Sequence, residues 1–412
     1  MPEPPPVPIH VLVVDDEPDL ELLMRHKFRR QVRDGRLALT FAGDGVEALA
    51  AVEADPRIEL VLSDINMPRM DGLTLLGKLR ELDRALKVVI VSAYGDMANI
   101  RTAMNRGAFD FVTKPINFED LALIVNKAHE ELDKLRQADQ LRRQLSVLHR
   151  ELEIASRIQL SMLPAATPAF PARDEFDLYA TMLPAQEVGG DFYDCFLIDA
   201  DDAEQQRLGF VIGDVSGKGV GAALFMAITR TMLRATALQG LPPHEVIRHA
   251  NRVLYPESMK HMFVTLVYGV LDLHSGEVAL SNAGHHHPVV LRQNGTQESC
   301  HCARGLGLCL TGDFAYASSS VTLEPGDTLL LYTDGLTEAV DTSGTQFEET
   351  RLTDSLDALP DRSPAEVIRH LLRAVESFSS GAPQADDLTL LAVQYNSPPG
   401  DTPSSTPSAA SA

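Results

Sequence analysis

The stretch 9-IHVLVVDDEPDLELLMRHKF-28 decides the fold of the amino-terminal part of the chain. Its first six residues are nearly all apolar, and Asp15 and Asp16 end this run abruptly. A short, almost uniformly apolar strand is typical of a parallel sheet that helices cover on both faces. From residue 17 to about residue 31 the apolar side chains take helical spacing. The stretch therefore predicts a buried strand, an acidic turn and a helix.

The same alternation of strand and helix continues to residue 127. Further apolar runs occupy residues 37–41, 58–63, 87–92 and 109–113. Helical patterns occupy residues 45–53 and 72–82, and another lies between the last two runs. This order of elements predicts a doubly wound, flavodoxin-like parallel α/β domain over residues 9–127.

Side chains that can carry chemistry follow four of these five apolar runs. They are Asp15 and Asp16 after the first run, Asp64 after the third, Ser92 at the end of the fourth and Lys114 after the fifth. In an open α/β sheet the carboxyl ends of the strands form the ligand crevice. Carboxylate oxygens bind Mg²⁺, and a free carboxylate can act as a nucleophile. We therefore expect Mg²⁺-assisted phosphoryl transfer at this edge.

These motifs resemble the receiver domain of two-component response regulators. The resemblance implies that a histidine kinase phosphorylates Asp64, and that Lys114 contacts the acyl phosphate. It implies a cis peptide bond before Pro115, and a pair of switch residues, Ser92 and Phe111. It also implies a Mg²⁺ site formed by Asp15, Asp16, Asp64 and the backbone of Asn66. The alternative is a domain with this fold that is not phosphorylated.

A different composition begins at about residue 118 and continues to residue 163. Glycine disappears, and leucine, glutamate, arginine and glutamine dominate. Apolar residues recur every three or four positions, and the heptad phase slips between Leu135 and Leu141. This pattern predicts a long helix that pairs in a parallel homodimer, with a coiled-coil and switch-helix linker over residues 128–165. The alternative is a single amphipathic helix packed on its own domain.

A second globular region, residues 166–395, is rich in strand patterns. Expected strands are 177–182, 208–213, 263–271, 278–282, 288–291, 328–332 and 388–394, and expected helices are 219–237, 243–254, 364–378 and a segment near 347–359. Strands and helices occur in separate runs, so we predict an α+β fold. The Pro-rich lead 1–8 and the Ser- and Pro-rich tail 396–412 are predicted to be disordered.

Four acidic motifs lie in glycine-containing turns of this region. They are GGDFYD at 189–194, GDVSGKG at 213–219, YTDGLTE at 332–338 and ADDLT at 385–389. Three of them adjoin a predicted strand, and their glycines let the backbone approach a ligand closely. Gathered carboxylates without histidine or cysteine ligands favour Mg²⁺ or Mn²⁺ over Zn²⁺. Two such ions can activate a water molecule and polarise a phosphoryl group.

These turns resemble the PPM family of metal-dependent protein phosphatases, in its bacterial sporulation and stress-response branch. The resemblance implies a β-sandwich flanked by helices, with two Mn²⁺ or Mg²⁺ ions, and direct attack of activated water on phosphoserine or phosphothreonine. The implied metal-site residues are Asp191, Asp214, the carbonyl of Val215, Asp334 and Asp386. Asp387 is an alternative ligand to Asp386. The motif Asn282-Ala283-Gly284-His285 also matches the branch, and His285 is either a general acid or a structural turn residue.

The segment 151–164 resembles the helix that leads into bacterial PPM domains and regulates their metal site. We hypothesise that phosphorylation of Asp64 changes receiver pairing and tightens the long helix, which docks residues 151–163 and raises phosphatase activity. The substrate implied by the resemblance is a small phosphoserine protein, such as an anti-sigma factor antagonist. The alternative function is an adaptor that uses the phosphatase fold to bind a protein partner.

The composition excludes several other classes of protein. A net charge of −22 opposes nucleic-acid binding and, with it, a transcription factor. We expect no signal peptide and no membrane span, and four cysteines fit a reducing cytoplasm. The group Cys300-His301-Cys302 resembles a fragment of a metal site, but a structural zinc site needs paired ligands at larger loop spacing. We therefore favour ordinary small residues near a strand edge.

Overall fold

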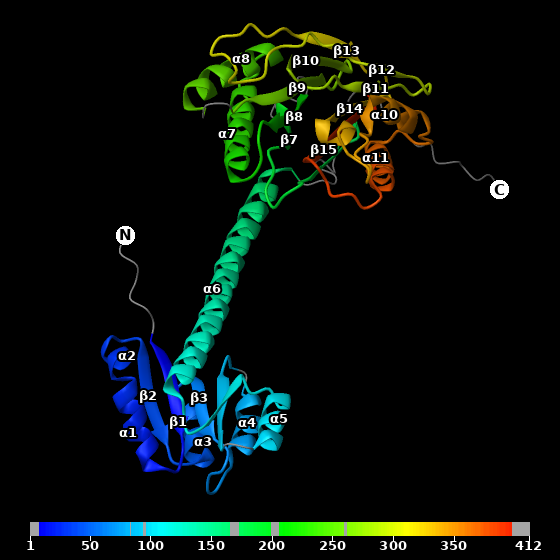
Figure 1. Cartoon of the computed structure of the whole chain (residues 1–412). Helices are drawn as coiled ribbons and strands as arrows, with labels where there is room; N and C mark the ends of the chain where they lie inside the picture. The colour runs from blue at the N-terminus through cyan, green and yellow to red at the C-terminus, as the bar shows by residue number, and fades with distance from the viewer. Residues whose placement is uncertain are drawn as a thin grey trace, which may run out of the picture. The chain divides into compact units, whose positions relative to one another are not determined.

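The computed structural model describes residues 8–82, 84–93, 96–164, 173–198, 206–258 and 262–397. Residues 1–7 and 398–412, which make up most of the predicted lead and tail, lie outside the described residues. The chain divides into two compact units, residues 1–148 and residues 149–412 (Figure 1). No helix in the described part of the chain is sufficiently long and apolar to span a membrane.

The first unit is built on a five-stranded parallel sheet with the order β2-β1-β3-β4-β5. Its strands are β1 (Ile9–Val14), β2 (Leu37–Ala42), β3 (Ile58–Asp64), β4 (Lys87–Ala93) and β5 (Asp110–Lys114). The predicted doubly wound α/β fold is confirmed. Because all five strands run in the same direction, their carboxyl ends lie at one edge of the sheet.

Helices cover both faces of this sheet. On one face α1 (Pro18–Lys27) and the first turns of α6 (Phe118–Met162) share a core with the side chains of β1. On the other face lie α3 (Gly45–Ala54), α4 (Gly72–Arg80) and α5 (Met97–Asn105). The helix predicted at 17–31 is two helices, because the chain turns at buried Phe28 before α2 (Arg29–Arg33) begins.

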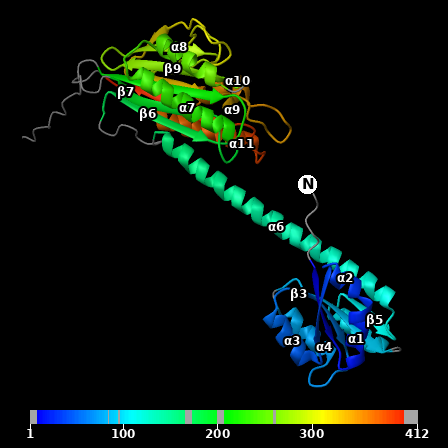
Figure 2. The same cartoon turned by 90° about the vertical axis from the view of Figure 1, so that its left-hand side faces the viewer.

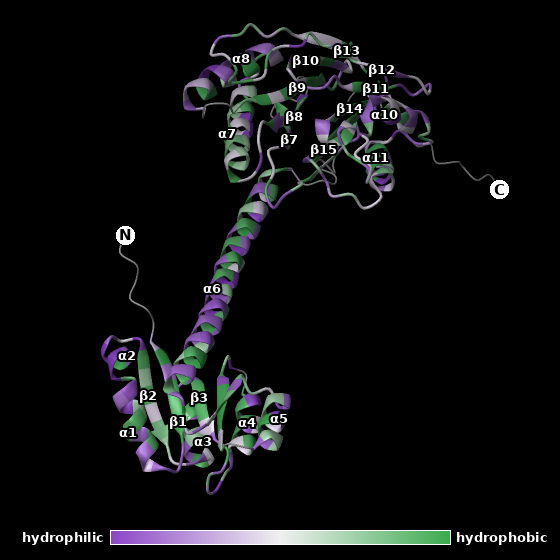
Figure 3. Cartoon of the chain, viewed as in Figure 1, coloured by the Kyte–Doolittle hydropathy of each residue, from purple (hydrophilic) through white to green (hydrophobic). Residues whose placement is uncertain are grey.

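Helix α6 passes from the first unit into the second, and the division between the units falls after Leu148. Near its start Leu121 and Leu132 are buried in the core of the first unit. Further along, Leu141 is 56% exposed and Leu145 is 57% exposed. Figure 3 shows apolar and polar residues alternating along this part of α6.

The second unit is a sandwich of two antiparallel sheets. Their orders are β13-β10-β9-β8-β7 and β12-β11-β14-β15-β6. The first sheet contains β7 (Phe192–Ile198), β8 (Arg207–Val215), β9 (Val264–Asp272), β10 (Glu277–Ala283) and β13 (Ser319–Thr322). The second contains β6 (Phe176–Leu183), β11 (Val289–Leu291), β12 (Gln297–Ser299), β14 (Thr328–Tyr332) and β15 (Leu388–Tyr395). This architecture confirms the predicted α+β sandwich.

Helices flank the sandwich on both sides (Figures 1 and 2). Helices α7 (Val220–Ala237) and α8 (Pro243–Leu254) pack against β7 to β10, and a short helix η1 (Tyr255–Glu257) follows. Helices α10 (Glu348–Asp357) and α11 (Pro364–Ser379) cover the second sheet, beside the one-turn helix α9 (Asp334–Thr337). The strands β7, β12 and β13 were not expected from the sequence.

Candidate active sites

Three aspartates form a compact acidic group at the carboxyl edge of the first unit. Asp15 and Asp16 follow β1, and Asp64 ends β3, the strand that pairs with β1. Each of the three offers a ligand oxygen, and these oxygens lie within 4.8 Å of one another. Hard carboxylate oxygens at this spacing fit a Mg²⁺ ion.

Lys114 joins this acidic group from the end of β5. Its Nζ lies 2.7 Å from Asp64 Oδ2 and 2.9 Å from Asp15 Oδ2. Burial lowers the pKa of Lys114, but the hydrogen bonds to Asp64 and Asp15 outweigh this effect and raise the pKa above its ordinary value. The lysine therefore stays cationic beside the carboxylate that would receive a phosphoryl group. The peptide bond between Lys114 and Pro115 is cis, as the resemblance implied.

Of the remaining predicted residues of this unit, Ser92 and Asn66 lie near the same edge, whereas Phe111 lies earlier in β5, opposite Ile90 of β4. Ser92, near the end of β4, is buried, and its Oγ has no hydrogen-bond partner among the described residues. Phe111 in β5 is partly buried against the core that lies under α3, α4 and α5. Asn66 is exposed, two residues after Asp64. The Ser92 hydroxyl therefore has a donor that no described residue uses.

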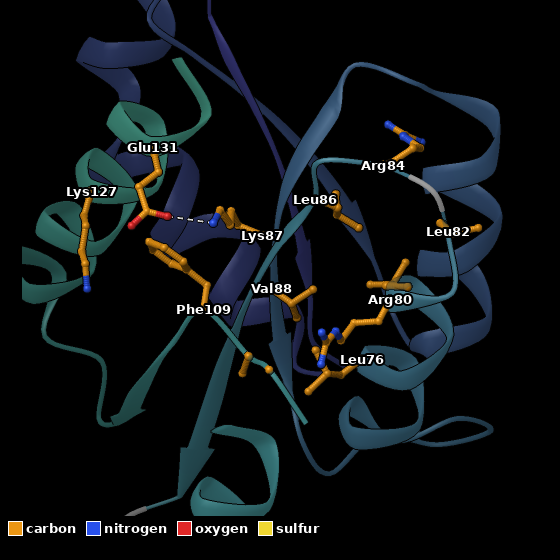
Figure 4. A pocket seen from close by; sticks show the side chains of 13 residues that line it. Leu76, Arg80, Leu82, Arg84, Leu86, Lys87, Val88, Phe109, Lys127 and Glu131 are labelled. Carbon is orange, nitrogen blue, oxygen red and sulfur yellow. Dashed lines mark hydrogen bonds and ion pairs between the residues drawn. The ribbon is translucent and has the colours of Figure 1, made fainter. Parts of the chain in front are cut away.

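The opposite edge of this sheet carries a cavity of about 580 Å³ (Figure 4). It lies where β4 begins and is lined by side chains such as Arg80, Lys87 and Phe109. Lys87 is paired with Glu131, and Arg80 donates to the carbonyl of Arg106. The cavity holds no group of carboxylates that could bind a metal ion among its lining residues, so the acidic group remains the candidate site of this unit.

In the second unit four aspartates lie at one end of the sandwich. Asp191 immediately precedes β7, and Asp214 lies near the end of β8, the antiparallel neighbour of β7. Asp334 begins α9 just after β14, and Asp386 precedes β15, the antiparallel neighbour of β14. The pairing directions therefore bring all four motifs to the same edge of the two sheets.

Burial and the charges of neighbouring carboxylates raise the pKa values of three of these aspartates. Burial, and then the charge of Asp214, raise the pKa of Asp191 well above its ordinary value. Burial and the charge of Asp334 raise the pKa of Asp214 to about 7. Burial and the charge of Asp386 raise the pKa of Asp334. Mutual repulsion of this kind marks a site suited to cations, although these oxygens are less tightly grouped than those of the first unit.

Asp387 has a different environment from Asp386, although the two are adjacent. The N–H groups of Ala185 and Gly190 donate to its Oδ1 and Oδ2, at 2.8 Å and 2.6 Å. Asp387 is buried, and these two hydrogen bonds fix the loop that leads to Asp191. The side chain of Asp386 is 36% exposed and lies 3.2 Å from Lys218 Nζ. The geometry favours Asp386 as the carboxylate available to a metal ion.

Close backbone contacts explain the glycines of these turns. A Cβ on Gly335 would lie 1.9 Å from the carbonyl oxygen of Asp387. A Cβ on Gly190 would lie 2.7 Å from the carbonyl oxygen of Val215. Any larger residue would push these two carbonyls and the aspartates beside them apart.

Thr333 and Lys218 belong to the site but were not singled out from the sequence. Thr333 Oγ1 donates to Asp191 Oδ2 at 2.7 Å and accepts the N–H of Thr389 at 3.0 Å, so it joins three of the four motifs. Lys218 Nζ donates to the carbonyl of Ala385 at 2.5 Å. The only sequence signal for both residues was their place inside the acidic motifs.

His285 is buried and both of its ring nitrogens have partners. Nε2 donates to the carbonyl of Tyr332 at 3.1 Å, and Nδ1 accepts from the hydroxyl of Thr265 at 2.8 Å. Burial lowers the pKa of His285 to about 3. A neutral, fully bonded imidazole favours the structural interpretation of this residue over the general acid.

Gln159 connects the end of α6 to the metal-site loop. Its Nε2 donates to the carbonyl of Gly189 at 2.6 Å, and the N–H of Gly189 donates back to its Oε1 at 3.1 Å. The side chain is buried, with 5% of the residue exposed. Gly189 lies two residues before Asp191, so α6 is hydrogen-bonded to the loop that carries this aspartate.

The first unit thus combines a doubly wound α/β fold with an acidic edge, and the second combines a two-sheet sandwich with four aspartates at one end. Comparison with known families finds a match for each unit. Residues 11–126 match the response regulator receiver domain, and residues 204–396 match the Stage II sporulation protein E (SpoIIE) family. The chain therefore contains a response regulator receiver region, followed by a region that belongs to the SpoIIE family.

Individual relatives agree with this assignment. The chain is 30% identical over 273 residues to Protein IcfG of Synechocystis sp., covering 60% of this chain and 42% of that protein. It is 29% identical to phosphoserine phosphatase RsbU of Bacillus subtilis, covering 46% and 53%. The chain thus spans about half the length of the curated relatives it matches. The SiaA-PP2C domain of Pseudomonas aeruginosa shares the fold, with a TM-score of 0.51, 23% identity, and coverage of 61% of this chain and 98% of that one.

Proposed function

We propose that this chain is a response regulator whose output is a Mg²⁺- or Mn²⁺-dependent serine/threonine protein phosphatase. The observation that carries the proposal is the convergence of Asp191, Asp214, Asp334 and Asp386 at one end of the sandwich. Their mutual repulsion in a partly buried site would be relieved by divalent cations. Two such ions would supply an activated water and positive charge for phosphoryl transfer.

The protein's own residues have distinct proposed roles in this site. Asp191, Asp214, Asp334, Asp386 and the carbonyl of Val215 would hold the cations. Asp387 and Thr333 would keep the loops in place through the hydrogen bonds described above. Lys218 lies against Asp386 and adds positive charge to an otherwise acidic cluster.

The names of the relatives, more than the site alone, support the proposed substrate class. RsbU and RsbP of Bacillus subtilis are both named phosphoserine phosphatases. We propose a phosphoserine or phosphothreonine protein as the substrate of this chain, with an anti-sigma factor antagonist as the first class to test. No pocket beside the aspartates is needed for such a substrate, because a protein would dock on the surface around them.

The receiver unit would control this activity through α6. Asp64, beside Lys114 and the two acidic neighbours, is the proposed phosphorylation site, with a histidine kinase as donor and Mg²⁺ as cofactor. We propose domain boundaries at 9–127, 128–165 and 166–395. In this scheme residues 151–163 dock when Asp64 is phosphorylated, and Gln159 passes the change to the loop that carries Asp191.

The deciding experiment is Mn²⁺-dependent hydrolysis of p-nitrophenyl phosphate by the full chain, compared with Asp214→Ala. Asp313→Ala is a matched control, because Asp313 is an exposed aspartate of the same unit. We expect the first variant to lose nearly all activity and the second to retain it. If the wild type binds Mn²⁺ but hydrolyses neither this compound nor a phosphoserine peptide, even after acetyl phosphate treatment, the adaptor function replaces the enzyme.

A further inference from the structure

Cys300 and Cys302 form a close pair of thiols outside the acidic site. Cys300 directly follows β12, and the two Sγ atoms lie 3.8 Å apart. Both residues are buried, with 8% and 5% exposed, and both are free cysteines. The two other cysteines, Cys195 and Cys309, are also buried and free.

The backbone between the paired cysteines is already folded into a tight turn. The N–H of Cys302 donates to the carbonyl of Cys300 at 2.8 Å, which is the hydrogen bond of a γ-turn. Such a turn draws the two Cα atoms closer than the roughly 7 Å that an extended two-residue step spans. Disulfides require Cα separations of roughly 4.4–6.8 Å. The remaining change is rotation of the side chains until the sulfur atoms reach about 2.05 Å.

The contact between the thiols also prepares one of them for reaction. The hydrogen bond from Cys302 lowers the pKa of Cys300, and this effect outweighs the burial that raises it. A thiolate, rather than a thiol, is the nucleophile toward peroxides and disulfides. Cys302 then stands next to Cys300 as the resolving thiol.

We propose that Cys300 and Cys302 are a redox modification site that closes into a reversible intrachain disulfide when a hydroperoxide oxidises it. The Cys300 thiolate attacks a peroxide oxygen, so that an S–O bond forms, the O–O bond breaks and hydroxide or alkoxide leaves. The sulfur of Cys302, having lost its proton, attacks Cys300, so that the S–S bond forms and the S–O bond breaks. Hydroxide leaves and is protonated to water. With hydrogen peroxide, two thiols yield one disulfide and two water molecules, and a dithiol reverses the reaction.

The pair is connected to the phosphatase site through a short segment of chain. The N–H of Cys300 donates to the carbonyl of Pro288 at 2.7 Å. Three residues before Pro288 is His285, whose ring bonds the carbonyl of Tyr332 shortly before Asp334. Contraction of the cysteine turn would pull on this segment. We therefore expect the oxidised protein to have a several-fold lower kcat/KM, an effect that rests on the proposed phosphatase function.

Mass spectrometry of the full chain tests the disulfide without reference to activity. Trypsin releases residues 293–304 as one peptide that contains both cysteines and neither of the others. After stepwise hydrogen peroxide and alkylation, we expect this peptide to lose two hydrogens while Cys195 and Cys309 still alkylate, and dithiothreitol to restore it. Cys302→Ser should instead give a sulfenic acid at Cys300, and Cys309→Ser should behave as the wild type. If Cys300 and Cys302 both alkylate fully when Cys309 is already oxidised, the proposal is overturned.

Activity measured on the same samples separates this proposal from the proposed function. Oxidised wild type should have a several-fold lower kcat/KM. The kcat/KM of Cys300→Ser and of Cys302→Ser should not change at the same dose of peroxide, because neither can form the disulfide. An unchanged rate in the fully disulfide-bonded chain would overturn the link to the phosphatase site. If the reduced wild type has no activity, the proposed function fails, but the peptide masses still decide whether the disulfide forms.

Discussion

At the scale of single residues, two neighbouring side chains in the acidic site have different proposed roles, one in metal binding and one in structure. Asp386 and Asp387 are adjacent in sequence, yet only Asp387 accepts hydrogen bonds from the loop before Asp191. Asp386 lies at the surface beside Lys218. A role in metal binding and a role in structure are therefore separable by two substitutions at consecutive positions.

We predict that Asp387→Ala lowers the free energy of unfolding by about 2 kcal/mol or more, because it leaves buried N–H groups without an acceptor. Asp386→Ala should change it by less than about 0.5 kcal/mol and should abolish Mn²⁺-dependent activity. Urea unfolding of the two variants, with activity measured in parallel, makes the comparison. Equal destabilisation by the two substitutions would contradict these roles.

His285 gives a prediction about pH. Its pKa is lowered to about 3 in the folded protein, whereas an unfolded histidine titrates near its ordinary value of 6.5. The unfolded state therefore binds more protons between these values, and stability falls as the pH falls from about 6.5 toward 3. The slope from this one group is at most about 1.4 kcal/mol per pH unit.

The measurement is urea unfolding at several pH values for the wild type, His285→Gln and His249→Gln. His249 is an exposed histidine of α8 and is the matched control. We expect the first variant to be less stable at neutral pH but to show a shallower slope, and the second to follow the wild type. If His285→Gln keeps the wild-type slope but loses a basic limb in its pH–rate profile, the general-acid interpretation is restored.

The aspartates of the site could be predicted from the sequence, but the residues that fix their loops by hydrogen bonds could not. Asp191, Asp214, Asp334 and Asp386 occur in recognisable glycine turns, and the structure places them at one edge. Thr333 and Gln159 act through hydrogen bonds to segments more than twenty residues away, and nothing in their local sequence specifies those partners. Their roles depend on sheet pairing, which only the tertiary structure reveals.

At the scale of elements, α6 is the most informative. Gln159 near its end bonds both backbone groups of Gly189. We predict that Gln159→Leu, which keeps the side-chain volume but removes these bonds, lowers kcat at least about tenfold, equivalent to about 1.4 kcal/mol. Gln144→Leu on the exposed part of the same helix is the control. An unchanged kcat at saturating Mn²⁺ would show that α6 does not act through Gly189.

The exposed leucines of α6 give a second prediction for this helix. Leu141, Leu145 and Leu148 are all more than half exposed in the single chain. We predict that they form the seam of a parallel homodimer, and that Leu141→Glu with Leu145→Glu shifts the full chain toward monomer. Sedimentation velocity measures this shift, with Gln140→Glu as control. A wild type that sediments as a monomer at all concentrations would contradict the paired helix.

Strands and helices with strong patterns could be predicted from the sequence, and weak ones could not. The five strands of the receiver were placed to within one residue at every end, because each is a short apolar run. Strand β7 was missed because its residues, FYDCFLI, include a buried aspartate that breaks the apolar run. Asp194 is tolerated there because Arg230 and Arg234 pair with it. The short strands β12 and β13 are polar edge strands without a periodic pattern.

At the scale of the whole molecule, we predict that Asp64→Asn removes the response of the phosphatase to acetyl phosphate with Mg²⁺. Wild-type activity should rise several-fold under the same treatment. Asp71→Asn, at the N-cap of α4, is a control that alters an aspartate of the same unit. Phosphate incorporation and peptide hydrolysis are measured together. Incorporation at Asp64 with no change in hydrolysis would separate the receiver from the output.

The helix α6 is buried at its start in the receiver core, through Leu121 and Leu132, and near its end in the phosphatase unit, through Gln159. If occupancy of Asp64 changes the affinity of the phosphatase unit for divalent cations, then thermodynamic reciprocity requires the same factor in the other direction. Cation binding at the output would then alter the equilibrium of phosphorylation at the input. The concentration of Mn²⁺ or Mg²⁺ in the cell would then change the fraction of receivers that carry phosphate at Asp64.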